Sequence, residues 1–144
     1  MKRILIAVAL TTLFTACATV DDKSVAVTVK SLQHHNWELT HVDGNTITYP
    51  EKTQKPRLEI GENFTANGLA GCNNFFGQAE LNESGEFRID KMAITKKMCS
   101  PSEMGIEQVM AETLSSWSQI ILTPENLTLK GENHELRLKL RDWM

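Results

Sequence analysis

The sequence Glu-Leu-Arg-Leu-Lys-Leu-Arg at residues 135–141 alternates strictly between apolar and charged side chains. Because successive side chains of a strand point to opposite faces, this period predicts a strand whose leucines are buried and whose charges lie in water. Leu127 and Leu129 show the same alternation upstream, and the turn-forming residues 130–133 separate the two segments. The two segments are therefore predicted to form a hairpin with one buried face.

Further short strands are predicted along the chain, because apolar residues alternate with polar ones between turn signals. Residues 43–45 (Asp-Gly-Asn) are a strong tight-turn signal, and residues 61–63 and 83–85 also contain glycine. The predicted strands cover residues 37–42, 57–60, 64–71, 78–81 and 86–95.

The last of these predicted strands changes phase in its middle. Phe87 and Ile89 fall on one face, whereas Met92 and Ile94 fall on the other. An extra residue in one strand of an antiparallel pair reverses the facing of every side chain after it. A bulge near residues 90–91 would bring all four apolar side chains to the same core.

One amphipathic helix is predicted over residues 101–116. Ser100 and Glu103 match a capping box, and Pro101 lies at the first helical position, where its missing N–H costs nothing. The apolar stripe that this helix would lay against the sheet consists of Ile106, Val109, Met110, Thr113, Leu114 and Trp117.

The N-terminus reads as a secretory signal. Lys2 and Arg3 precede an apolar run at residues 4–14, and small residues follow up to Cys17. Eleven residues at about 1.5 Å of rise each are too short to cross a hydrocarbon core of roughly 30 Å. We therefore expect residues 1–16 to be a signal peptide, removed from the mature protein.

Residues 13–17 resemble the lipobox of bacterial lipoproteins, with Phe14 at a position where leucine is commonest. The resemblance implies that Cys17 is lipidated and that residues 17–30 form the lipidated N-terminus and a tether. Because Ala18 follows the cysteine, lipoprotein sorting rules imply the outer membrane, on its periplasmic face. An ordinary secreted protein with a cysteine near its cleavage site is the alternative.

Residues 31–144 then form a single domain, which we expect to be monomeric. The chain is acidic, with a net charge of −3 at pH 7. Nucleic acids and anionic head groups both favour clusters of Lys and Arg, so no nucleic-acid partner is expected. The expected contact with a membrane is through the lipid anchor.

Two cysteines, Cys72 and Cys99, remain after Cys17. An even pair in an oxidising compartment favours a disulfide that joins a strand end to the start of the helix. Alternatively, Cys72 could be a nucleophile on a glycine-rich loop, or the pair could serve a thiol redox enzyme or redox sensor, since a helix N-terminus makes Cys99 reactive when free.

No other chemistry is indicated by the sequence. His34 and His35 are adjacent and would diverge in any regular element, and no Cys, Asp or Glu lies near them at metal-ligand spacing. The carboxylates are scattered at predicted turns and solvent faces, and no pair of them is suited to acid–base work. We therefore expect no catalytic residue, no metal and no cofactor.

Three segments together resemble the META domain. They are residues 37–44, which begin Trp-Glu-Leu, the loop Gly-Leu-Ala-Gly-Cys-Asn-Asn-Phe-Phe-Gly at 68–77, and Met-Ala-Ile-Thr-Lys-Lys-Met-Cys at 92–99. The resemblance extends over about residues 31–143. It implies an α+β fold: a curved antiparallel β-sheet or cracked barrel with one amphipathic helix packed against it.

The resemblance also implies structural roles for the shared residues. Gly68 and Gly71 would allow close backbone contact, an Asn of the loop would suit a left-handed turn, and Cys72 and Cys99 would be placed to form a disulfide. It further implies a role in heat shock, envelope stress and antibiotic tolerance. We therefore expect a non-enzymatic envelope lipoprotein that binds a peptide, protein or lipid, with the thiol redox function as the alternative.

Overall fold

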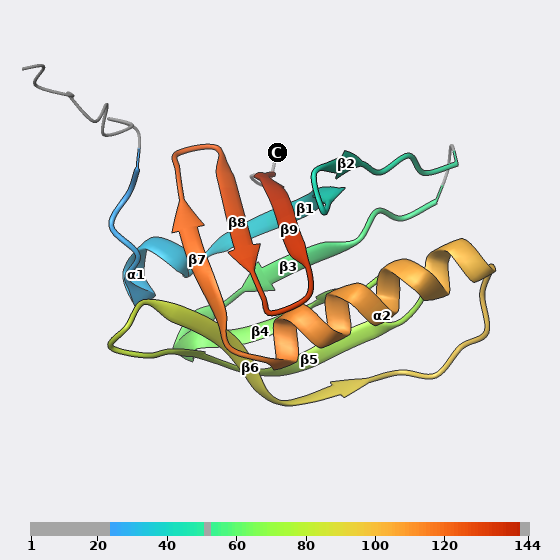
Figure 1. Ribbon diagram of the computed structural model, residues 1–144. Coiled ribbons are helices and arrows are strands. Elements are labelled where there is room, and N and C mark those ends of the chain that lie inside the picture. Colours follow the sequence, from blue (N-terminus) through green and yellow to red (C-terminus); the bar gives the residue numbers. More distant parts are fainter. Residues whose placement is uncertain (1–23, 51–52, 142–144) are drawn as a thin grey trace, which may run out of the picture.

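The computed structural model describes residues 24–50 and 53–141 (Figure 1). This part of the chain contains one long helix, α2 (Pro101–Ser115), a short helix, α1 (Val29–Leu32), and a 3-10 turn, η1 (Glu62–Phe64). Its nine strands form one antiparallel sheet: β1 (His35–Val42), β2 (Asn45–Thr46), β3 (Arg57–Ile60), β4 (Thr65–Leu69), β5 (Asn74–Leu81), β6 (Glu86–Ile94), β7 (Ser118–Leu122), β8 (Asn126–Lys130) and β9 (Glu135–Leu140).

The sheet closes into a barrel, because the last strand pairs with the first. The order runs β1-β3-β4-β5-β6-β7-β8-β9, and β9 pairs antiparallel with β1, with Leu39 opposite Leu138. β2 is an added strand on β1, outside this circuit of eight. The α+β class is confirmed, but the predicted curved sheet or cracked barrel is wrong. The closing pair joins opposite ends of the domain, so β1 and β9 do not remain the two edges of an open sheet.

The C-terminal hairpin follows the predicted alternation. Leu127 lies opposite Leu138 and Leu129 opposite Leu136, and all four side chains are buried in the core. At the other end of the barrel circuit, Trp37 and Leu39 of β1 belong to the same core. The apolar face of each strand therefore points into the barrel.

The predicted bulge lies in β6. Phe76 of β5 faces Ala93, whereas Gln78 faces Asp90, so β6 carries one extra residue between these two pairs. Lys91 lies at this bulge and has a left-handed backbone conformation, with a φ of 48°. As predicted, the apolar side chains before and after the bulge all pack in or against one core.

Helix α2 fills the side of the barrel where two strands diverge. β6 and β7 pair only through Glu86 with Gln119 and Phe87 with Ser118. The helix connects these two strands in the chain and contacts both β6 and β9, and Figure 1 shows it running alongside the barrel. Its Met110 and Leu114 are fully buried in the core.

The predicted start of the helix is confirmed, whereas the helix ends one residue earlier than predicted. Ser100 caps the start through the predicted capping box, with Glu103 bonding back to the Ser100 amide at 2.9 Å. At the other end the helix stops at Ser115, so Trp117 leaves the predicted apolar stripe. The Trp117 side chain is 38% exposed, and the Arg88 guanidinium lies 4.5 Å from its ring centre.

Removing the cap should destabilise the domain modestly. Ser100→Ala is expected to lower the free energy of unfolding by about 1 kcal/mol, because it leaves amides of the first turn without their acceptor. Urea unfolding followed by circular dichroism measures the change. Ser102→Ala, which keeps the capping box, is the control and should not lower stability. Equal stability of the Ser100→Ala variant and the parent would contradict the role of the cap.

Candidate functional site

The loop between β4 and β5 packs directly under helix α2. Gly71 has a φ of +154°, and a Cβ there would lie 2.5 Å from the Glu103 carbonyl oxygen of the helix. At Gly68, a Cβ would lie 2.0 Å from the Arg57 carbonyl oxygen of β3. Only glycine permits approaches this close, so the expected close backbone contacts are confirmed at both positions.

Glu107 of α2 holds this loop from above. The residue is 9% exposed, and its Oε2 accepts hydrogen bonds from the amides of Cys72 at 3.2 Å and Asn73 at 2.6 Å. Its Oε1 accepts a third from Asn73 Nδ2 at 3.0 Å. Placing all carboxylates at turns and solvent faces was therefore wrong for Glu107. A carboxylate removed from water needs such donors to offset its lost hydration.

Asn73 links the loop to the segment that follows β6. Its Oδ1 accepts hydrogen bonds from Thr95 Oγ1 at 3.0 Å and from the Lys97 amide at 2.6 Å, and its Nδ2 reaches the Lys97 carbonyl at 3.1 Å. Neither Asn73 nor Asn74 has a positive φ, so the left-handed turn expected for an Asn of this loop is wrong. Asn73 acts through its amide side chain instead.

A disulfide joins Cys72 to Cys99, whose Cα atoms lie 5.9 Å apart. Cys72 is 4% exposed, and Cys99 is half-buried, immediately before the Ser100 cap. We call Cys72, Asn73, Glu107 and Cys99 the loop clamp. The clamp ties together the β4–β5 loop, the segment after β6 and the helix, with both covalent and charge-assisted bonds.

The sequence signal for Glu107 lay in helical spacing. Glu107, Met110 and Leu114 fall at i, i+3 and i+7, so they share the face that the structure buries. A carboxylate on the apolar face of an amphipathic helix indicates donors opposite it. Those donors include the backbone amides of Cys72 and Asn73. Backbone groups are the same in every residue, so the pattern of side chains could not predict them.

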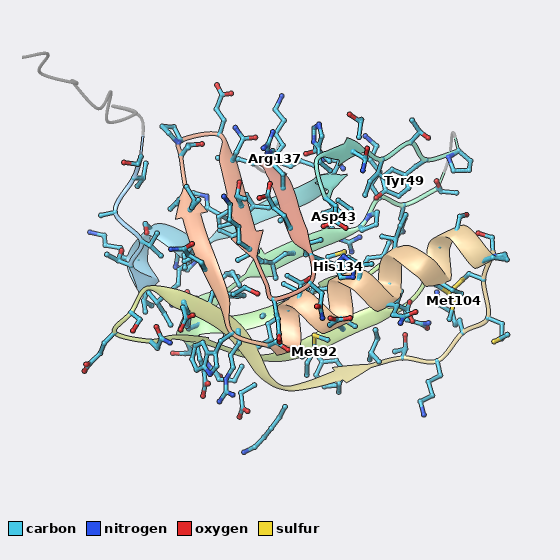
Figure 2. All side chains as sticks on the ribbon, in the orientation of Figure 1. Asp43, Tyr49, Met92, Met104, His134 and Arg137 are labelled. Carbon is cyan, nitrogen blue, oxygen red and sulfur yellow. A yellow bond between two sulfur atoms is a disulfide. The ribbon has the colours of Figure 1, made fainter. Side chains whose placement is uncertain are left out.

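His134 lies away from the loop clamp and contacts Asp43. His134 Nδ1 lies 2.8 Å from Asp43 Oδ2, and the Glu135 amide donates to Asp43 Oδ1 at 2.8 Å (Figure 2). The Glu135 amide first, and then His134, lower the pKa of Asp43. A carboxyl group whose pKa is lowered in the folded state stabilises the fold at pH values above its ordinary pKa. This stability is lost as the pH falls through the lowered pKa. This pair ties the β1–β2 turn to the start of β9.

Two hollows lie away from the loop clamp. One, of about 350 Å³, is a polar groove where Glu38 bonds to Lys55 and Arg141, each at 2.7 Å. The other, of about 190 Å³, lies at one end of the barrel. It is lined by Val25, Ser31, His35, Trp37, Leu122, Thr123, Pro124 and Leu140.

Within the described residues, no group of three or more His, Cys, Asp or Glu side chains is placed to hold a metal ion. In the same part of the chain, no helix has both the length and the apolar character needed to cross a membrane. The predicted signal peptide and the lipidation site Cys17 lie outside the described residues. Within the predicted tether of residues 17–30, the Val25 amide donates a hydrogen bond to the Leu122 carbonyl of β7.

Comparisons with known proteins point to one family. Residues 30–143 match the META domain. The whole chain aligns with Heat shock protein HslJ of Escherichia coli strain K12, at 32% identity over 99% of that protein. A structure solved by NMR matches at 32% identity and a TM-score of 0.72, over 83% of this chain and 99% of the other. An NMR structure from Burkholderia xenovorans shares the fold, with a TM-score of 0.66 at 17% identity over 98% and 99% of the two chains.

Proposed function

Because this chain belongs to the META domain family, we propose that it is a non-enzymatic envelope lipoprotein that protects the cell during heat shock and envelope stress, including exposure to antibiotics. The full-length similarity to Heat shock protein HslJ carries the proposal. The protein acts by binding a peptide, protein or lipid partner from the periplasmic face of the outer membrane.

The loop clamp supports a binding role over a catalytic one. All three hydrogen bonds that Glu107 accepts come from Cys72 and Asn73, so its carboxylate is committed to holding the loop. Catalytic carboxylates instead face a substrate that they protonate or deprotonate. The buried polar groups of this domain thus favour a rigid scaffold that presents its surface to a partner.

Survival under stress tests the proposal directly. A strain that lacks the gene is expected to survive a shift to high temperature, and an antibiotic challenge, less well than its parent. A plasmid copy of the gene should restore survival, and the empty plasmid is the control. Equal survival of the deletion strain and the parent in both challenges would refute the proposed role.

Anchoring through Cys17 is a separate prediction. Cys17→Ser should abolish acylation and move the folded protein out of the membrane fraction, because about 0.8 kcal/mol of membrane affinity is lost with each buried methylene of the acyl chains. Mass spectrometry of the N-terminal peptide and fractionation of envelopes measure both effects. Recovery of the Ser variant in the membrane fraction at the parent's level would contradict lipid anchoring.

A thiol redox function is the second candidate, and the position of Cys99 favours it. Cys99 is half-buried and lies next to the Ser100 cap of α2, where the helix dipole would stabilise its thiolate after reduction. The reduction potential of the disulfide separates the two functions. Resistance to a glutathione buffer indicates a structural bond, whereas ready reduction by that buffer indicates a redox function.

A further inference from the structure

We propose that the open edge of β7 is a strand-addition site, at which the protein binds an extended apolar segment of a partly unfolded partner protein. This inference rests on the proposed function, for which it names the binding surface and the class of partner. In this binding mode main-chain hydrogen bonds supply affinity, and alternate side chains enter pockets.

Among the described residues, the second half of β7 lacks a partner strand on the side of β6. β6 pairs with β7 only up to Gln119, whereas β7 continues to Leu122. β6 begins at Glu86, and the turn at residues 83–85 leads from there back to β5. Residues 120–122 therefore pair with β8 on one side and with no part of β6 on the other. Because the groups that face one side of a strand belong to alternate residues, Ile120 presents its N–H and C=O on the same side as Leu122.

The chain itself shows that this edge accepts an extended backbone. The Val25 amide donates to the Leu122 carbonyl at 2.8 Å, and the two residues form an isolated antiparallel bridge. Continuing this register places Val27 opposite Ile120. Residues 24–27 read Ser-Val-Ala-Val, so the segment now resting on the edge is small, apolar and β-branched. A partner segment with these properties would fit the same position.

The side chains around the edge suit such a segment. Val25, Ile121 and Val29 are 37%, 40% and 43% exposed, so apolar side chains on the edge strand and on the segment beside it remain accessible. The hollow of about 190 Å³ opens beside them and is lined by Trp37, Leu122 and other residues given above. Val25 also lines this hollow, so a side chain of an added strand that took the place of Val25 would lie beside it.

The protein's own segment uses only part of this edge of β7. One bridge pairs residues 24–27 with β7, while the Ala26 carbonyl accepts a hydrogen bond from Ser31 Oγ at 2.8 Å and Val27 packs against the core. A partner segment of three residues or more could bond to Ile120 as well as to Leu122. A partner therefore gains hydrogen bonds that the protein's own segment does not make. A partly unfolded partner exposes extended segments with unpaired N–H and C=O groups, so it can supply such a strand.

A synthetic peptide of the chain's own sequence, Ser-Val-Ala-Val-Thr-Val-Lys from residues 24–30, serves as the probe. Added to the isotope-labelled protein, it should shift the NMR signals of residues 118–123 and release the amide of Val25. The same peptide with proline in place of its first valine lacks the key N–H and should bind at least roughly tenfold more weakly.

Two matched variants locate the contact. Ile121→Lys places a charge on the open part of the edge and should weaken peptide binding about tenfold or more, because edge lysines oppose strand addition. Gln119→Lys places the same charge on the same strand where β6 already pairs, and it should bind like the parent. Equal binding of both peptides, or of both variants, would overturn the site.

Sedimentation and survival complete the test. Concentration-dependent self-association that Ile121→Lys abolishes would make a second copy the occupant and overturn the partner assignment. In cells, a deletion strain that survives stress like its parent refutes the proposed function, whatever the peptide does. A deletion strain rescued equally by the parent gene and by Ile121→Lys leaves the proposed function standing and removes this site from it.

Discussion

Replacing Cys72 and Cys99 together by alanine is expected to lower the free energy of unfolding by roughly 3–4 kcal/mol. The bond closes a loop between residues 27 positions apart, and its loss frees the unfolded chain to explore many more conformations. Urea unfolding of the double variant measures the change. The parent protein unfolded in the presence of a strong reductant is the control and should show a similar loss.

The same variant distinguishes the two candidate functions. A structural disulfide acts on the unfolded chain, so the double variant should keep partner binding and stress protection at temperatures where it is folded. A double variant with the parent's stability but without stress protection would reverse this assignment in favour of redox chemistry. Two free thiols in protein isolated from the envelope would rule out the structural disulfide.

Glu107→Ala should also destabilise the domain strongly, by about 2–4 kcal/mol, since hydrogen bonds to a charged group contribute about 1.5–3 kcal/mol and buried donors without a partner carry a further cost. The change leaves the amides of Cys72 and Asn73 without their acceptor. Urea unfolding again gives the value. Gln108→Ala, at the exposed neighbouring position of the same helix, is the control and should be nearly neutral.

The losses of stability caused by removing the disulfide and by removing the Glu107 carboxylate should not be additive. Glu107 and the disulfide hold the same loop, and residues that share a structural element usually couple. We expect the triple variant at Cys72, Cys99 and Glu107 to lose less stability than the sum of the separate losses. A strictly additive result would show that the helix and the disulfide fix the loop independently, and a Glu107→Ala variant as stable as the Gln108→Ala control would refute the clamp.

Local features of this fold were predictable, because each has a local cause. The phase change between Phe87 and Met92 required an extra residue, and the structure places it at Lys91. Ser100 and Glu103 lie three residues apart and cap the helix as their spacing indicated. In both cases the physical constraint acts within a few residues, so the sequence pattern records it directly.

The features that were missed depend on distant parts of the chain. Barrel closure pairs Leu39 with Leu138, and nothing in either strand distinguishes this partner from other alternating strands. The buried role of Glu107 depends on backbone amides of a loop that reaches the helix only after folding. Trp117 lies outside the helical stripe because α2 ends at Ser115 and β7 begins at Ser118.

Closure of the barrel by β1 and β9 has a consequence for the order in which the protein folds. The closing partners lie almost a full domain apart in sequence, and such contacts form late because a long loop must be ordered first. A chain that lacks residues 135–140 leaves β1 and β8 with unpaired edges. The domain therefore stays open while the chain is being made, and it reaches its final form only after its last strand is free.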